Sequence, residues 1–133
     1  MDTRADAERL PLEVLPEQAQ AIAAALRPFK GHKVRLFSTP PTDETVRLAE
    51  SLANVMQSAG LNPQHFRVGS LVLESGKSPE RGITIYFGKH QIAISNALVT
   101  VLVTQKVVDP ERSIRLIPSN EPDRFIVCLS PTS

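Results

Sequence analysis

The sequence has one cysteine, no tryptophan, and aromatic residues at only 5% of its 133 positions. A single cysteine, Cys128, excludes an internal disulfide and a zinc site built from several cysteines. Because Cys128 falls in an expected strand, we interpret it as a small buried apolar residue. Neither sign of charge dominates, since 15 Lys and Arg against 14 Asp and Glu give a net charge of +1. That balance offers no electrostatic attraction for nucleic acid, which we therefore do not expect as a partner.

Long hydrophobic runs are also missing. No apolar run reaches the roughly 18 residues that a membrane-spanning helix needs, and the N-terminus lacks the apolar core of a signal peptide. We therefore expect the chain as written to be soluble, without direct insertion into a membrane. Its length suits one domain, whose hydrophobic core is large enough to be stable without disulfides or a bound metal. We predict a flexible N-terminal arm over residues 1–15 and a single α/β domain over residues 16–133.

Two helices are predicted in the first half of the chain. The first covers residues 16–27, where Pro16 suits a first helical turn and Pro28 ends the helix. The second is capped by Thr42 and ends at Gly60, and its apolar residues recur on one face.

The rest of the chain is expected to fold around the stretch over residues 81–108. Residues 83–87 (ITIYF) are predicted to form a strand that is buried on both faces. Polar residues recur about every fourth position over residues 91–108, which predicts a helix. The many β-branched residues there leave an alternative, a hairpin that turns at Ser95-Asn96.

Further strands are expected at residues 34–38, 66–73, 114–117 and 125–129. Without the first helix the order is βαββαβ, which is typical of an α+β sandwich with the split βαβ, ferredoxin-like arrangement. The short connection from Leu73 to Ile83 favours an antiparallel hairpin. The alternative is a small three-layer parallel α/β sheet.

The candidate site follows from this expected topology. We expect strands 34–38 and 83–87 to be adjacent and parallel, so that both following helices start at the same edge of the sheet. Helix N-termini with nearby hydroxyl groups and a lysine can bind an anion. The sequence thus predicts a weak phosphate or carboxylate site made of Ser38, Thr39, Thr42, Gly88, Lys89 and His90. The alternative is that Thr42 is only a cap and Lys89 is solvated.

No pattern indicates a metal site or catalysis. His32, His65 and His90 are scattered over expected turns, whereas a metal needs converging ligands. Cys128 has no histidine near it in sequence, and no serine occupies a nucleophile elbow. We therefore expect no metal, no cofactor and no catalytic residues. The wide apolar arc of residues 91–108 and the low charge of the last strand favour a face or edge that a protein partner or a second copy covers. The alternative is a well-buried helix and a covered edge.

Four stretches resemble a soluble domain found in uncharacterised bacterial proteins, where it often follows transmembrane segments. They are PEQAQAIAAALRPFKGHKV, DETVRLAESLANVMQSAGL, GITIYFGKHQ and FIVCLSP. The resemblance implies a longer native product that is tethered to a membrane, and it brings no catalytic residues. We therefore expect a non-catalytic interaction or sensor domain. The alternative is a small-anion-binding domain or an enzyme that uses the two helix starts.

Overall fold

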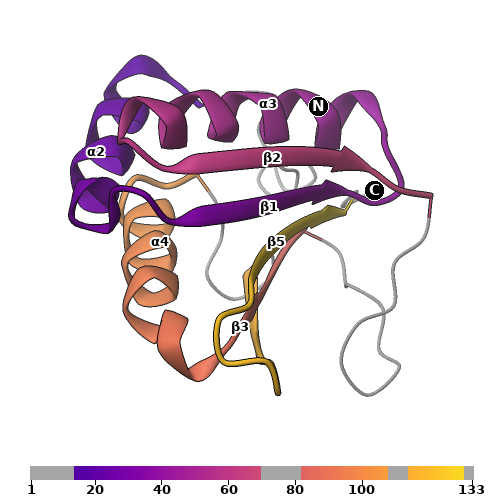
Figure 1. The fold of residues 1–133 in the computed structure, drawn as a ribbon. Coiled ribbons are helices and arrows are strands. Elements are labelled where there is room, and N and C mark those ends of the chain that lie inside the picture. The colour runs from indigo at the N-terminus through magenta and orange to yellow at the C-terminus, as the bar shows by residue number, and fades with distance from the viewer. Residues whose placement is uncertain (1–13, 70–81, 108–113, 131–133) are drawn as a thin grey trace.

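A computed structural model describes residues 14–69, 82–107 and 114–130. These residues form a five-stranded mixed sheet with three α-helices packed against it (Figure 1). The helices are α2 (Pro16–Leu26), α3 (Asp43–Ser58) and α4 (Ile92–Thr104). The strands are β1 (Lys33–Ser38), β2 (Asn62–Arg67), β3 (Gly82–Phe87), β4 (Ile114–Pro118) and β5 (Phe125–Ser130).

The sheet has the strand order β2-β1-β5-β3-β4. β1 is parallel to β2 and to β5, and β3 is parallel to β4 but antiparallel to β5. The chain therefore contains two βαβ units, β1-α3-β2 and β3-α4-β4, whose strands run in opposite directions. β5, the last strand in sequence, lies between them and joins the two units into one sheet.

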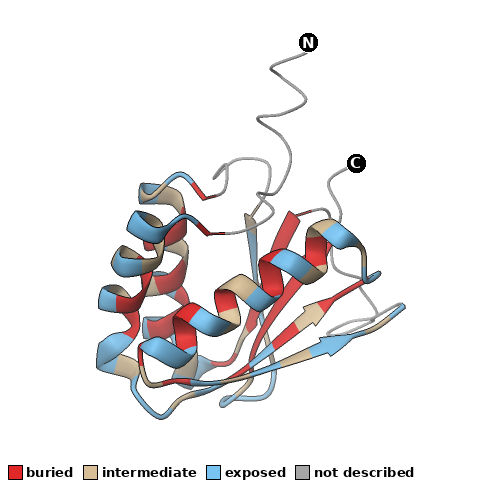
Figure 2. Cartoon of the chain, turned by 90° about the horizontal axis from the view of Figure 1, so that it is seen from above, coloured by how far each residue is buried: buried red, intermediate tan, exposed pale blue. Residues whose placement is uncertain are grey.

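The mixed α/β class predicted from the sequence is confirmed, but the split βαβ arrangement is not. β1 and β3 were expected to be adjacent and parallel, whereas β5 separates them and they run in opposite directions. β2 and β3 were expected to form a hairpin and are not neighbours. Residues 70–81, which include part of the expected connection, lie outside the described residues. The described helices cover one face of the sheet (Figure 2), so the three-layer alternative is not seen either.

Element types were predicted better than their ends. The strand predicted over residues 66–73 overlaps only the end of β2, which covers residues 62–67. Residues 68–69 are not in a strand, and residues 70–73 lie outside the described residues. Pro63 of β2 has no amide hydrogen for the ladder, which is tolerated because β2 is an edge strand. α4 runs through Ser95 and Asn96 without interruption, so the hairpin alternative is excluded. Val14, placed in the flexible arm, is buried and its backbone N–H donates to Ser51 Oγ at 2.8 Å, while residues 1–13 lie outside the described residues.

The hydrophobic core lies between the helices and one face of the sheet. Alternate residues of each inner strand point into it, such as Leu36 of β1, Ile85 of β3 and Val127 of β5. A smaller cluster of Tyr86, Ile126 and Cys128 lies on the opposite face. β3 and β5 are buried on both faces, which confirms the prediction for residues 83–87. Burial raises the pKa of the Cys128 thiol to about 12, as expected for an inert core cysteine.

Candidate functional site

The structure does not bring the six residues of the predicted anion site together. Ser38 is the last residue of β1 and is followed by Thr39 and Thr42, whereas Gly88, Lys89 and His90 follow β3. Because β1 and β3 run in opposite directions, their C-terminal ends, and with them the two groups of residues, lie at opposite ends of the sheet along the strand direction. A single site built from both helix starts is therefore not formed.

Ser38 and Thr42, at and after the end of β1, form hydrogen bonds with nearby side chains and backbone. Thr42 caps α3, since its Oγ1 accepts from the Thr45 backbone N–H at 3.2 Å. The Ser38 hydroxyl lies 2.6 Å from Nε2 of His65. A serine beside a histidine has the form of a nucleophile and its base. Ser38 is 0% exposed, however, so this hydroxyl is closed to a substrate.

His65 was expected in a turn but lies in β2, half-buried under α3. Burial lowers its pKa below the ordinary value of 6.5, and the Arg67 guanidinium lowers the pKa further, while Glu50 of α3 raises it. Glu50 also pairs with Arg67 at 3.3 Å, which ties α3 to the edge strand. The fold therefore favours the neutral imidazole.

This preference predicts a loss of stability in mild acid. A histidine whose pKa is lowered by folding stabilises the native state above its unfolded pKa, and this contribution is lost as pH falls through the folded pKa. We expect the free energy of unfolding, measured by urea denaturation, to decrease as pH falls from about 7.5 toward 5. His65→Gln should make this decrease smaller. An equal decrease in both proteins would show that His65 is not the group responsible.

Gly88, Lys89 and His90, the residues after β3, lie beside the turn between β4 and β5. Gly88 packs against the turn between β4 and β5, and its backbone N–H donates to the Arg124 carbonyl at 2.8 Å. The His90 backbone N–H donates to the Pro122 carbonyl at 2.9 Å. His90 Nδ1 also lies 2.9 Å from Asp123 Oδ1. These contacts hold the turn over residues 119–124 in place.

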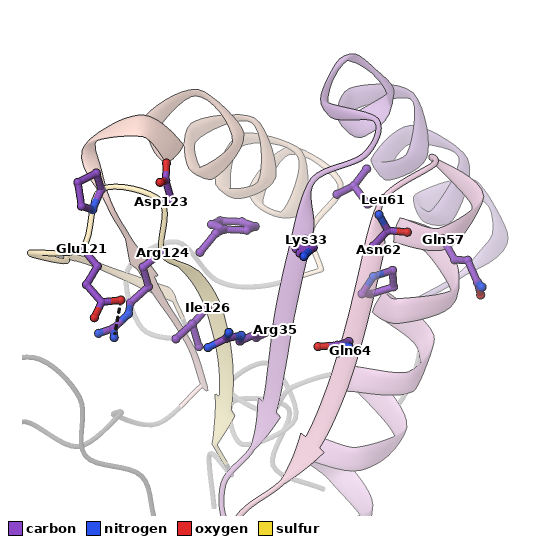
Figure 3. A pocket seen from close by; sticks show the side chains of 13 residues that line it. Lys33, Arg35, Gln57, Leu61, Asn62, Gln64, Glu121, Asp123, Arg124 and Ile126 are labelled. Atoms are coloured by element: carbon purple, nitrogen blue, oxygen red, sulfur yellow. Dashed lines mark ion pairs between the residues drawn. The ribbon is translucent and has the colours of Figure 1, made fainter.

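The same turn forms one wall of a hollow of about 710 Å³ at the end of the sheet where β1, β2 and β5 begin (Figure 3). Arg35 and Ile126 line it, and they lie on the face opposite the helix-packed residues Leu36 and Val127. The lining comprises Lys33, Arg35, Gln57, Leu61, Asn62, Pro63, Gln64, Glu121, Pro122, Asp123, Arg124, Phe125 and Ile126.

The strand side of the hollow is rich in hydrogen-bond donors. Strand register places Lys33 beside Asn62 and Arg35 beside Gln64, so each cation has an amide as its neighbour. Both cations are exposed, and neither has an ion-pair partner among the described residues. Arg124 differs, because its guanidinium pairs with Glu121 at 2.9 Å. The hollow thus offers an unpaired lysine and an unpaired arginine side by side on one strand.

No protein-family model, curated protein or solved structure matches this chain. Function must then follow from the site itself. In the part of the chain that the structure describes, no helix is long and apolar enough to cross a membrane. The described ranges also contain no group of three or more His, Cys, Asp or Glu side chains that could hold a metal ion.

The hollow could not be predicted from the sequence, because its residues come from four separate segments. The only local signal was the alternation of charged and apolar residues in KVRLFS, which puts Lys33 and Arg35 on the same face of a strand. The described lining residues include no serine, threonine, cysteine or histidine. The chemistry that the lining offers is that of hydrogen-bond donors on the strand side and carboxylate acceptors on the side of the turn.

Proposed function

We propose that this chain is a non-catalytic binding domain of the sensor kind, whose ligand is a small organic anion held in the hollow. The observation that carries the proposal is the pair of unpaired cations, Lys33 and Arg35, on the same face of β1 within that hollow. A planar guanidinium binds a carboxylate or phosphate through two parallel hydrogen bonds, and a neighbouring ammonium adds charge. Asn62 and Gln64 supply further donors from β2.

The size and chemistry of the hollow support the binding of a small molecule. Its volume of about 710 Å³ lies within the roughly 300–1,000 Å³ of small-molecule sites. Leu61, Pro63 and Ile126 give it an apolar part beside the cations. A ligand with an anionic group and a small apolar body fits such a lining. This location replaces the helix starts as the place where we expect an anion to bind.

Isothermal titration of N-acetylalanine, a simple monocarboxylate, tests the proposal. We expect weak but saturable binding that Arg35→Gln reduces by roughly ten- to a hundredfold, because a hydrogen bond to a charged group contributes about 1.5–3 kcal/mol. Lys33→Gln should also weaken binding. Arg47→Gln is the matched control, since Arg47 is an exposed arginine of α3 outside the hollow. Absence of binding by the wild-type chain, or equal losses for Arg35 and Arg47, would refute the proposal.

Association with a protein is the second candidate, but not through an open edge of the last strand. The last strand was expected to leave an edge open, whereas β5 lies between β1 and β3. The edge strands are β2 and β4, and each carries a large exposed apolar residue, Phe66 (41% exposed) and Leu116 (40% exposed). Phe66 stacks on Phe37 with ring centroids 5.2 Å apart. Light scattering decides whether these edges mediate self-association, because a strict monomer at high concentration counts against it.

A further inference from the structure

We propose that the ligand is a zwitterion, an amino acid or short peptide with a free ammonium group at one end and a free carboxylate at the other. This inference rests on the proposed function and concerns the same hollow. Its basis is the opposite chemistry of the two walls. Figure 3 shows Lys33, Asn62 and Gln64 on the strand side, and Glu121 and Asp123 on the side of the turn. One wall thus donates to an anionic group while the other accepts from a cationic one.

The acidic wall has acceptor capacity to spare. Glu121 pairs with Arg124 through Oε2, and Asp123 pairs with His90 through Oδ1. Each carboxylate therefore uses one oxygen in the contact with its neighbour, and a carboxylate can accept several hydrogen bonds. Both side chains are largely exposed, at 68% for Glu121 and 83% for Asp123. An ammonium group in the hollow would have two carboxylates near it, Glu121 beside Arg124 and Asp123 beside His90.

The acidic wall is also held in a fixed position before any ligand arrives. The Ser119 backbone N–H donates to the Phe87 carbonyl at 2.8 Å, which anchors the start of the turn to the end of β3. The contacts of Gly88 with Arg124 and of His90 with Pro122 anchor the remainder. Because the cations lie on β1 of the same sheet, the two walls are held in a fixed position relative to each other. A preorganised site of this kind avoids part of the entropy cost of binding.

The same arrangement disfavours other anions. A phosphate monoester or a nucleotide brings about two or more negative charges, and the turn side of the hollow already carries two carboxylates against the single cation of Arg124. Nucleotides are also commonly held by stacking on an exposed aromatic face. Phe125, the only aromatic residue in the described lining, is buried at 5% exposure. A single carboxylate accompanied by an ammonium satisfies both walls without repulsion.

Isothermal titration with three related dipeptides tests this inference. The probes are Ala-Ala with free termini, N-acetyl-Ala-Ala without the ammonium, and Ala-Ala amide without the carboxylate. We expect Ala-Ala to bind tightest and each blocked form to bind at least about tenfold more weakly. Asp123→Asn and Glu121→Gln should weaken the binding of Ala-Ala without weakening that of N-acetyl-Ala-Ala. Asp43→Asn, an exposed carboxylate of α3 outside the hollow, is the control and should change neither.

The outcomes separate the two proposals. If N-acetyl-Ala-Ala binds as tightly as Ala-Ala and both need Arg35, the anion site stands and the zwitterion inference is overturned. If none of the dipeptides nor N-acetylalanine binds, the proposed function itself fails. If Ala-Ala binds with equal affinity to the Asp123→Asn and Glu121→Gln variants, the acidic wall does not contact the ammonium and the inference is also overturned.

Discussion

Replacing Gly88 with alanine is expected to lower the free energy of unfolding by about 1–3 kcal/mol or more, the usual cost of forcing extra atoms into a packed site. A Cβ at this position would overlap the backbone carbonyl oxygen of Glu121 and the carbonyl group of Pro122. These are main-chain atoms, so no flexible side chain can give way. The fold must either strain or move the turn that forms the acidic wall of the hollow. Urea denaturation measures the first effect and peptide titration the second.

Gly69→Ala is the matched control for Gly88→Ala. A Cβ at Gly69 would meet no atom within 4 Å, and its φ does not lie in the left-handed region. We expect its stability to be unchanged or slightly raised, because alanine has less conformational freedom than glycine in the unfolded chain. If Gly88→Ala were as stable as Gly69→Ala and bound peptide normally, the close approach of Gly88 to the turn would be wrong.

The second large effect is expected from Leu98→Ala. Leu98 is fully buried in α4 and belongs to the core between helices and sheet. Truncating a buried leucine to alanine costs about 2–5 kcal/mol, since apolar contacts are lost and a cavity remains. We expect a corresponding fall in the free energy of unfolding, measured by urea denaturation with unchanged helical circular dichroism under native conditions.

Ile92→Ala provides the comparison within the same helix. Ile92 is 47% exposed at the first position of α4, so its truncation should change the free energy of unfolding far less. The contrast between the two variants tests which face of α4 is buried. Similar losses for both would contradict the packing of this helix, and a small loss for Leu98→Ala would do so as well.

Local signals in the sequence were sufficient for most helices and strands. Thr42 was predicted to cap the second helix, and its hydroxyl does accept from the Thr45 backbone. Gly60 was predicted to follow the end of that helix, and its φ of +92° is one that residues with a Cβ rarely adopt. The apolar, two-faced run of residues 83–87 correctly indicated an inner strand. Each of these features depends on residues close together in the chain.

Strand pairing could not be predicted in this way, because it depends on contacts between distant segments. β5 pairs with β1 in parallel and with β3 in antiparallel, and neither partner is its neighbour in sequence. One signal was available but was interpreted differently. Phe125–Ser130 is apolar almost throughout, which is typical of a strand buried on both faces. That pattern favours a central strand, whereas low charge alone had suggested an open edge.

The candidate site was missed for the same reason. The anion site predicted at the helix starts required β1 and β3 to point in the same direction, and the sheet places them in opposite directions. The hollow instead combines Lys33 and Arg35 with the turn around Glu121, nearly the full length of the domain away in sequence. No spacing rule connects residues so far apart. The only local signal of the hollow was the alternation of charged and apolar residues along β1.

The most direct test of the proposed site is to map where a small carboxylate binds. Two-dimensional ¹H–¹⁵N NMR spectra, recorded during titration with N-acetylalanine, report on each backbone amide. If the carboxylate binds in the hollow, the largest shifts fall on residues 33–35, 62–64 and 121–126, and Arg35→Gln removes them. Shifts confined to residues 39–45 or 88–92 would place the anion at a helix start instead. That result, or a spectrum that does not change, would contradict the proposed site.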